Sequence, residues 1–450
     1  MNKIKNIKMR SRTLITTVLL LLSMISMGQI DSLHKSLLQK ALENNQQIKK
    51  AQLEAESYKY KVKEVRSAFL PGINASLDVK DYLEQPVSII PGELFGMDED
   101  VEGTLGKPHT LDAGFTVSQL VFSAQTLQSF KTVKSTQKLY ELKKIQTEED
   151  IIYHVSKAYY YLLITYENLN VLEENLKLLE HNKTITQRFI ENEMAIQTDL
   201  ARIQLKITET ENQINITKSG IYEQLQNLKL LVGTDDISIP EDFGIIQHRR
   251  DHIYNESIDV TNRIDFKTLM QAQIINDYQL QSEKAKLYPT VSIYGNYMYN
   301  AQRDEFNYFD SGEKWNNISL IGLKLSFPIF SGFKTNATIQ QAKINQNITS
   351  LNIEYAEFAY NKEYHVSLHK LELYRNNRDA MYENTRLAQE IYNKSLLRYQ
   401  EGILPLTDLL DAETDLSNTK LNYLKSELDV YTAELDVHKT SGEIKTILSN

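Results

Sequence analysis

The chain has 450 residues, of which 41 % are hydrophobic and 24 % are charged, and its formal net charge is −9. An acidic protein binds nucleic acid poorly, so we expect no nucleic-acid partner. The sequence contains no cysteine, which excludes disulfides and zinc sites of the cysteine type.

Residues 1–28 predict a signal peptide and therefore an exported protein. Five basic residues precede an apolar stretch from Leu14 to Met27, and small residues stand where a cleavage before Gln29 requires them. A retained anchor helix is the alternative, but this stretch is shorter than the roughly 20 residues of a bilayer span. Removing the peptide takes away five cations and no acid, which changes the formal charge from −9 to −14. Because no later stretch of about 18 apolar residues occurs, we expect the mature chain to enter a membrane only as strands.

The mature chain is an internal repeat of about half its length, with predicted repeats at 29–240 and 241–450. Glycine and proline cluster at matched places in both halves and are scarce between these places. Landmark residues recur at offsets from 208 to 218: Pro71 and Pro289, Val121 and Ile329, Arg188 and Arg398, Gly233 and Gly442.

Each repeat predicts a helix, a β-hairpin, a very long helix, a tip and a shorter helix. In the first repeat these are residues 31–67, 70–122, 126–191, 191–198 and 199–231. In the second repeat they are residues 255–287, 288–330, 334–401, 402–407 and 406–439. The predicted fold class is therefore mainly α, and the two shorter helices of a repeat, laid end to end, would match the long one.

The last helix carries two apolar seams. One recurs every seven residues, and the other lies on a different side: Leu409, Leu416, Tyr423, Val430 and Val437, and then Leu421, Leu424, Leu428, Tyr431 and Leu435. Two seams predict packing on both flanks of the helix, as in the wall of a helical barrel. A solid helical bundle with a wide core is the alternative.

The two hairpins contain four segments in which apolar and polar residues alternate. This pattern is typical of outer-membrane strands, with one face on lipid and the other on water. Taken singly, each segment also fits an ordinary half-buried hairpin. The candidates for the lipid-facing side are Phe115, Val117, Leu323, Leu325 and Phe327. Since about eight strands are the minimum for a membrane barrel, several chains would have to share one.

The stretch RYQEGILPLTDLLDA, which begins at Arg398, resembles the TolC-like outer membrane efflux proteins. Weaker matches are YPTVS from Tyr288 and FSG from Phe330, and the resemblance covers nearly the whole mature chain. It implies a homotrimer with a long coiled-coil-like α-helical barrel and a transmembrane β-barrel shared by three chains. The implied function is the outer membrane channel of a tripartite efflux or type I secretion system. Its partners would be outer membrane lipid, a periplasmic adaptor protein and an inner-membrane pump. The protein itself would lie in the cell outer membrane, with a long periplasmic extension.

Gly402 and Pro405 interrupt the second long helical region, and in this resemblance they form the turn at its periplasmic tip. Leu404 and Leu406 are apolar residues that we expect to be exposed there, which suggests a partner surface. The predicted adaptor-docking residues are Gly402, Ile403, Leu404, Pro405 and Met194. The first tip, 191–198, has no glycine, so its turn geometry and its register against the second tip stay open by one residue.

Asp408 and Asp411 lie one helical turn apart at the start of the last helix. The resemblance implies that they ring a periplasmic gate and that Asp199 bonds Tyr399 to lock it. Leu404 stands where the family's lock has an arginine, so the closed state would be looser. The alternative is that both aspartates only stabilise the positive end of their helix.

The sequence shows no phosphate-binding glycine loop, nucleophile elbow or zinc-protease helix, so we expect no enzyme and no cofactor. His365 and His369 have a metal-compatible spacing, but we interpret them as polar residues on a helix face and predict no metal. Residues 89–96 read only as an extracellular loop. The alternative function is a periplasmic scaffolding coiled-coil protein without a pore.

Overall fold

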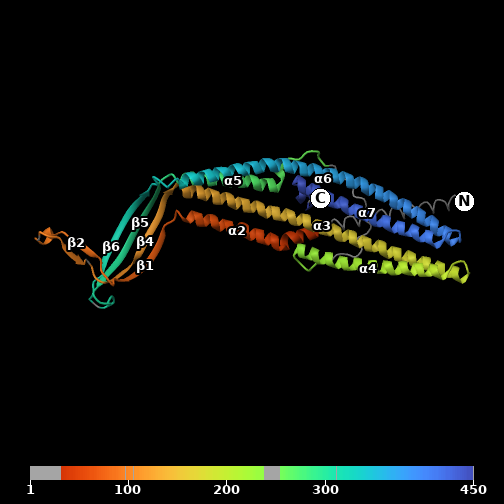
Figure 1. Cartoon of the computed structure of the whole chain (residues 1–450), viewed down its shortest axis with the longest axis horizontal. Helices are drawn as coiled ribbons and strands as arrows, with labels where there is room; N and C mark the ends of the chain where they lie inside the picture. The colour runs from red at the N-terminus through yellow and green to blue at the C-terminus, as the bar shows by residue number, and fades with distance from the viewer. Residues whose placement is uncertain (1–31, 97, 105, 238–253, 311, 449–450) are drawn as a thin grey trace, which may run out of the picture. The chain divides into compact units, whose positions relative to one another are not determined.

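The computed structural model describes residues 32–96, 98–104, 106–237, 254–310 and 312–448 (Figure 1). The predicted signal peptide lies outside the described residues. The chain divides into two compact units, the helix unit (Met1–Ala55, Tyr140–Met270 and Asn352–Asn450) and the sheet unit (Glu56–Leu139 and Gln271–Leu351).

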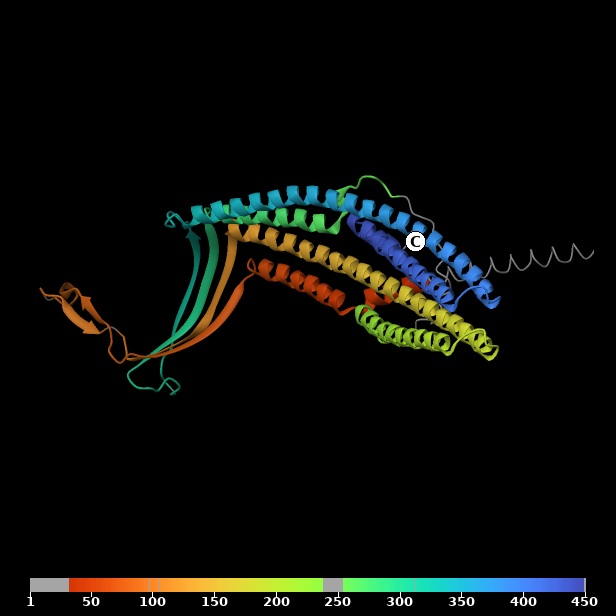
Figure 2. The same ribbon diagram turned by 45° about the vertical axis from the view of Figure 1, so that its right-hand side comes forward.

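Both halves contain a helical segment, antiparallel strands, a very long helix and a shorter helix, in that order (Figures 1 and 2). Residues 32–44 are helical, and the named helices are α2 (Gln46–Ser67), α3 (Ala124–Glu191), α4 (Gln197–Val232), α5 (Ile264–Ala285), α6 (Lys334–Gln400) and α7 (Leu406–Ser441). The two long helices have 68 and 67 residues, and the two helices that follow the tips have 36 each. No helix among the described residues has the length and apolar composition to cross a membrane.

The prediction of one continuous helix over 31–67 is wrong, because the helix breaks at Asn45. The Asn45 side-chain oxygen accepts the backbone N–H groups of Gln47 at 2.8 Å and Ile48 at 3.3 Å, and so caps α2. Its amide nitrogen donates to the carbonyl of Leu231 at 2.6 Å. A Cβ added to Gly233 would lie 2.7 Å from the Asn44 carbonyl, so only glycine lets the end of α4 come this close.

The second repeat has a corresponding junction, where the end of α7 meets the start of α5. Helix α5 begins at Ile264, nine residues after the predicted helix start at residue 255. Asp259 caps a short 3-10 turn, Val260–Asn262, which lies within the stretch that we predicted to be α-helical. A Cβ on Gly442, at the end of α7, would lie 3.1 Å from the Cα of Arg263. The buried Arg263 guanidinium donates to Glu363 at 2.7 Å and stacks 4.0 Å over the ring of Tyr360.

Both apolar seams of α7 are used inside the helix unit. Tyr431 and Leu435 pack in a core with Ile152 and Tyr160 of α3, whereas Val430 and Val437 pack with residues of α6 such as Leu371. The prediction that α7 packs on both flanks is therefore confirmed. The tips have a third core, to which α3, α4, α6 and α7 all contribute.

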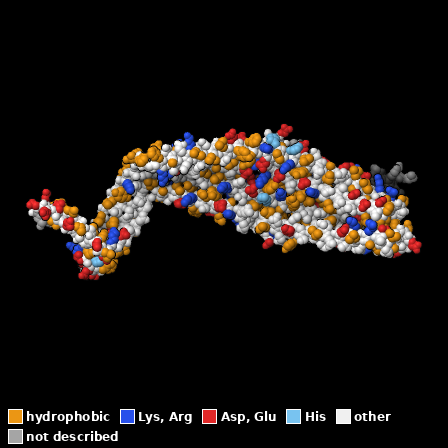
Figure 3. Space-filling model, in the orientation of Figure 1, with side chains coloured by type: hydrophobic (Ala, Val, Ile, Leu, Met, Phe, Trp, Pro, Cys, Tyr) orange, Lys and Arg blue, Asp and Glu red, His pale blue; other side chains and the backbone are white. Residues whose placement is uncertain are grey.

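The sheet unit contains an antiparallel sheet in the order β1 (Gly72–Asp81), β4 (His109–Ser123), β5 (Thr290–Arg303) and β6 (Asn316–Ser326). Its register confirms that the predicted apolar residues share one face, because residues directly opposite one another point the same way. Opposite pairs include Ile73 with Val117, Phe115 with Tyr297, Ile293 with Leu323 and Val291 with Leu325. Hydrophobic side chains reach the surface along these strands (Figure 3). Phe327 lies one residue beyond β6, so it belongs to the strand end.

The long first hairpin loop holds a second sheet that the sequence did not predict. Its strands are β2 (Val87–Ile90) and β3 (Val101–Thr104), and a 3-10 turn, Gly92–Phe95, lies between them. Four-residue strands give too short an alternation to recognise without the pairing partner.

Candidate functional site at the helical tips

The second tip has the turn predicted from Gly402 and Pro405. Gly402 has a left-handed φ of 71°, and the N–H of the next residue, Ile403, donates to the carbonyl of Arg398 at 2.9 Å. Pro405, with φ −63°, precedes the first residue of α7. Glycine thus ends α6 and proline starts α7, as each residue's backbone preference requires.

The first tip repeats this geometry without glycine. Glu193 has φ 59°, and the N–H of Met194 donates to the carbonyl of Phe189 at 2.7 Å. Glu193 therefore takes the place of Gly402, at an offset of 209. The same offset relates the first residues of α4 and α7, so the register that the sequence left open is fixed.

The two tips touch and expose a small apolar surface. A Cβ on Gly402 would lie 3.0 Å from the terminal methyl of Met194. Met194, Ile196 and Ile403 are between 61 % and 64 % exposed. The expectation for Leu404 and Leu406 is wrong: Leu404 is half-buried against the tip core, and Leu406 is buried within it.

Asp408 and Asp411 lie on the exposed side of α7, within its first two turns. The Asp408 carboxylate accepts the Thr407 hydroxyl at 3.3 Å. Among the described residues, no ion pair forms with either aspartate, so their charges face solvent within one chain. This exposure is compatible with both predicted roles, gate carboxylates and helix-end charges.

Tyr399 is buried, and its hydroxyl lies 2.6 Å from that of Thr186 on α3. Asp199 instead accepts the backbone N–H of Ile196 at 3.5 Å, at the start of α4. Within the described part of the chain, the predicted bond between Asp199 and Tyr399 is therefore not formed. Burial raises the pKa of Tyr399, and the nearby charge of Asp199 adds to this effect, so the phenol stays protonated.

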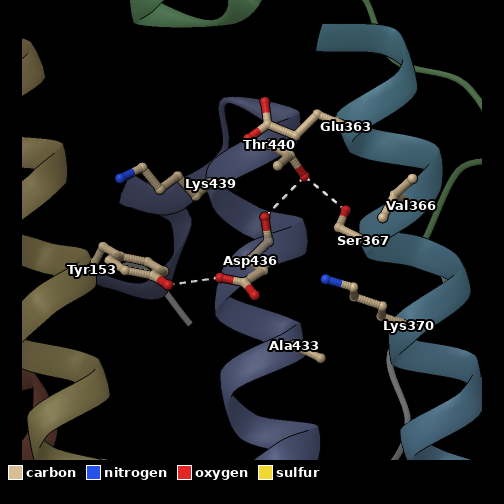
Figure 4. A pocket seen from close by; sticks show the side chains of 9 residues that line it. All are labelled: Tyr153, Glu363, Val366, Ser367, Lys370, Ala433, Asp436, Lys439 and Thr440. Carbon is tan, nitrogen blue, oxygen red and sulfur yellow. Dashed lines mark hydrogen bonds between the residues drawn. The ribbon is translucent and has the colours of Figure 1, made fainter. Parts of the chain in front are cut away.

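A polar groove of about 300 Å³ lies away from the tips, between α3, α6 and α7 (Figure 4). The hydroxyl of Tyr153 donates to Asp436 at 2.7 Å, and the hydroxyls of Ser367 and Thr440 lie 2.9 Å apart. These groups satisfy one another across the three helices, so we interpret the groove as part of their packing. Sequence reasoning had no signal for it, because its residues come from three distant segments.

Comparison with known proteins decides the family. The sequence model described as outer membrane efflux protein matches residues 37–234 and 262–443. The chain belongs to the outer membrane efflux protein family. This confirms the family, the outer-membrane location and the part in efflux that the resemblance implied.

Solved structures of this efflux protein fold cover nearly the whole chain. The outer-membrane channel OprN has 14 % sequence identity and a TM-score of 0.72, over 92 % of this chain and 91 % of its own. The CmeC outer membrane channel of Campylobacter jejuni has 18 % identity and a TM-score of 0.72, over 91 % and 86 %. The open MtrE outer membrane channel of Neisseria gonorrhoeae has 19 % identity and a TM-score of 0.71, over 91 % and 89 %. A search of curated proteins found no match.

Proposed function

We propose that three copies of this efflux protein form one passive duct through the outer membrane, which docks a periplasmic adaptor and an inner-membrane pump. The duct would serve tripartite efflux or type I secretion. Each chain would contribute two repeats, 29–240 and 241–450, and four strands of a shared barrel.

The observation that carries this proposal is the sheet. Its apolar face is exposed in a single chain, with Ile321, Leu323 and Leu325 all more than 60 % exposed. In its described residues, β1 and β6 each pair on one side only, so each leaves a row of backbone donors and acceptors open. Inside a membrane such edges must pair, and β1 of one copy against β6 of the next closes the sheet without edges.

The helices support the same assembly. An exposed apolar line runs along α6 at alternating steps of three and four residues: Ile344, Ile348, Leu351, Tyr355 and Phe358. Water-exposed apolar lines with this spacing pack against another helix, which a neighbouring copy would supply. The helices would then form the wall of a barrel.

The tips are the proposed periplasmic entrance. Met194, Ile196 and Ile403 would meet the adaptor, with Gly402 and Pro405 setting the turn. In a trimer, three copies of Asp408 and of Asp411 would surround one axis. Like charges so confined favour a bound cation, which makes them the proposed gate.

Fractionation and reconstitution test the duct. We expect the mature protein in the outer membrane fraction, as a trimer in detergent, with ion conductance in planar bilayers. A soluble protein without conductance would contradict the proposal and favour the scaffolding alternative.

A further inference from the structure

A buried polar cluster lies beside the tips, formed by Glu413 of α7, Asn182 of α3 and Tyr392 of α6. We call it the Glu413 cluster. The three side chains are at most 4 % exposed, and the surrounding core is built from apolar residues such as Leu179 and Leu416. A carboxyl group in such surroundings is unusual enough to need a physical role.

Polar atoms of this cluster lack hydrogen-bond partners. Among the described residues, none pairs with the Oε2 atom of Glu413, with either amide atom of Asn182 or with the Tyr392 hydroxyl. Asn182 lies close enough to Glu413 and Tyr392 to lower the pKa of each, which offsets part of the effect of burial. Its amide nevertheless reaches no regular hydrogen-bond geometry with either side chain. Burying polar atoms without hydrogen-bond partners costs free energy. The polar contacts of this cluster therefore stabilise the packing of α7 against α3 and α6 only weakly.

The charge state of Glu413 depends on pH near neutrality. Burial raises its pKa to about 8, against the opposing effects of Asn182 and of Lys206 on α4. From α6, Tyr392 faces the same carboxyl, and burial and Glu413 both raise the pKa of its phenol. The cluster therefore holds a neutral carboxylic acid at pH 7 and an ionised one above about pH 8.

An ionised Glu413 would be a charge in a mostly apolar core, where Asn182 and Lys206 offset the cost of its burial only in part. Moving this part of α7 toward solvent relieves that cost, and Asp408 and Asp411 lie within the two preceding helical turns. We propose that Glu413 is a proton-dependent latch, whose protonated side chain lets α7 pack against α3 and α6 beside the tips and whose ionisation releases it. The latch does not depend on the proposed duct.

Hydrogen exchange resolved by peptide tests the latch on the full mature protein in detergent. After correction for the intrinsic rate, we expect wild-type protection over 406–416 to fall about tenfold per pH unit between about pH 6 and 8, because opening releases one proton. Glu413→Gln should remove this dependence. Glu427→Gln is the matched control, since Glu427 is equally buried on α7 but accepts the Tyr423 hydroxyl.

Glu149, far from the tips on α3, titrates in the same pH range because burial raises its pKa to about 7. The readout must therefore be local to the tips. The proposal is overturned if wild-type protection over 406–416 does not vary with pH, or if Glu413→Gln varies as the wild type does. Should Glu413→Gln fail to fold, infrared spectroscopy replaces it, in a Glu149→Gln background. A protonated-carboxyl band that disappears as pH rises through about 8 supports the latch, and the absence of that band refutes it.

Discussion

The hydroxyl of Tyr399 on α6 lies 2.6 Å from that of Thr186 on α3, which joins the second tip to the first long helix inside the core. Tyr399→Phe removes this bond and should destabilise the helix unit by about 1 kcal/mol. We expect a higher resting conductance in planar bilayers and a lower midpoint of urea unfolding. Tyr222→Phe, at an exposed tyrosine on α4, is the control. Unchanged conductance with a lowered midpoint would leave Tyr399 a purely structural role.

The proposed gate role of Asp408 and Asp411 can be distinguished from that of ordinary helix-end charges. Asp408→Ala combined with Asp411→Ala should weaken the block of single-channel current by divalent and trivalent cations, because the ring of charge that attracts them is lost. Glu390→Ala, an exposed carboxylate paired with Arg386, should leave the block unchanged. If the double variant keeps normal block and loses only about 0.3 to 1 kcal/mol of stability, both aspartates act as helix-end charges.

The two tips offer a paired test of backbone strain. Glu193→Gly should stabilise the protein by about 1 kcal/mol, since a left-handed φ is costly for a residue with a Cβ. Gly402→Ala should destabilise it by a similar amount or more, because the added Cβ is also crowded by Met194. Thermal unfolding of both variants measures whether each substitution raises or lowers the stability. If both substitutions change the stability in the same direction, φ at these positions is not the controlling factor.

The exposed apolar tip surface can be tested by a charge. Ile403→Asp should abolish export and leave the amount of outer membrane trimer unchanged, because the side chain makes no contribution to the tip core. Leu373→Asp, at an exposed apolar position elsewhere on α6, should export normally. Leu404→Asp is a poorer probe, since Leu404 packs against the core. Normal export by Ile403→Asp would exclude this surface as the docking site.

The two faces of the sheet can be compared at neighbouring residues of β4. Phe115→Arg should cost roughly 2 to 4 kcal/mol if this side faces lipid near the midplane, and should reduce the trimer in the outer membrane. Thr116→Arg should be mild, because Thr116 points to the other face and is also exposed. Immunoblots of membrane fractions give the amounts. Equal losses would contradict the lipid-facing assignment.

The sequence predicted what depends on periodicity, such as the two seams of α7 and the apolar face of the strands. It missed features that depend on distant partners. The break at Asn45 is fixed by the carbonyl of Leu231, 186 residues away in the chain. Glu193 gives no sign of a left-handed turn, because glutamate is common in helices. Glu413 stands among other acidic residues and reads as solvent-exposed, whereas the packing of three helices buries it.

The unpaired edges of β1 and β6 bear on genetics as well as on structure. In the proposed trimer, a variant with a damaged tip but intact edges would still assemble with wild-type copies, and one such copy would disturb the entrance that the three copies share. Tip variants should therefore be dominant when both genes are expressed in one cell. Variants that cannot form the sheet would stay out of the assembly, so they should be recessive.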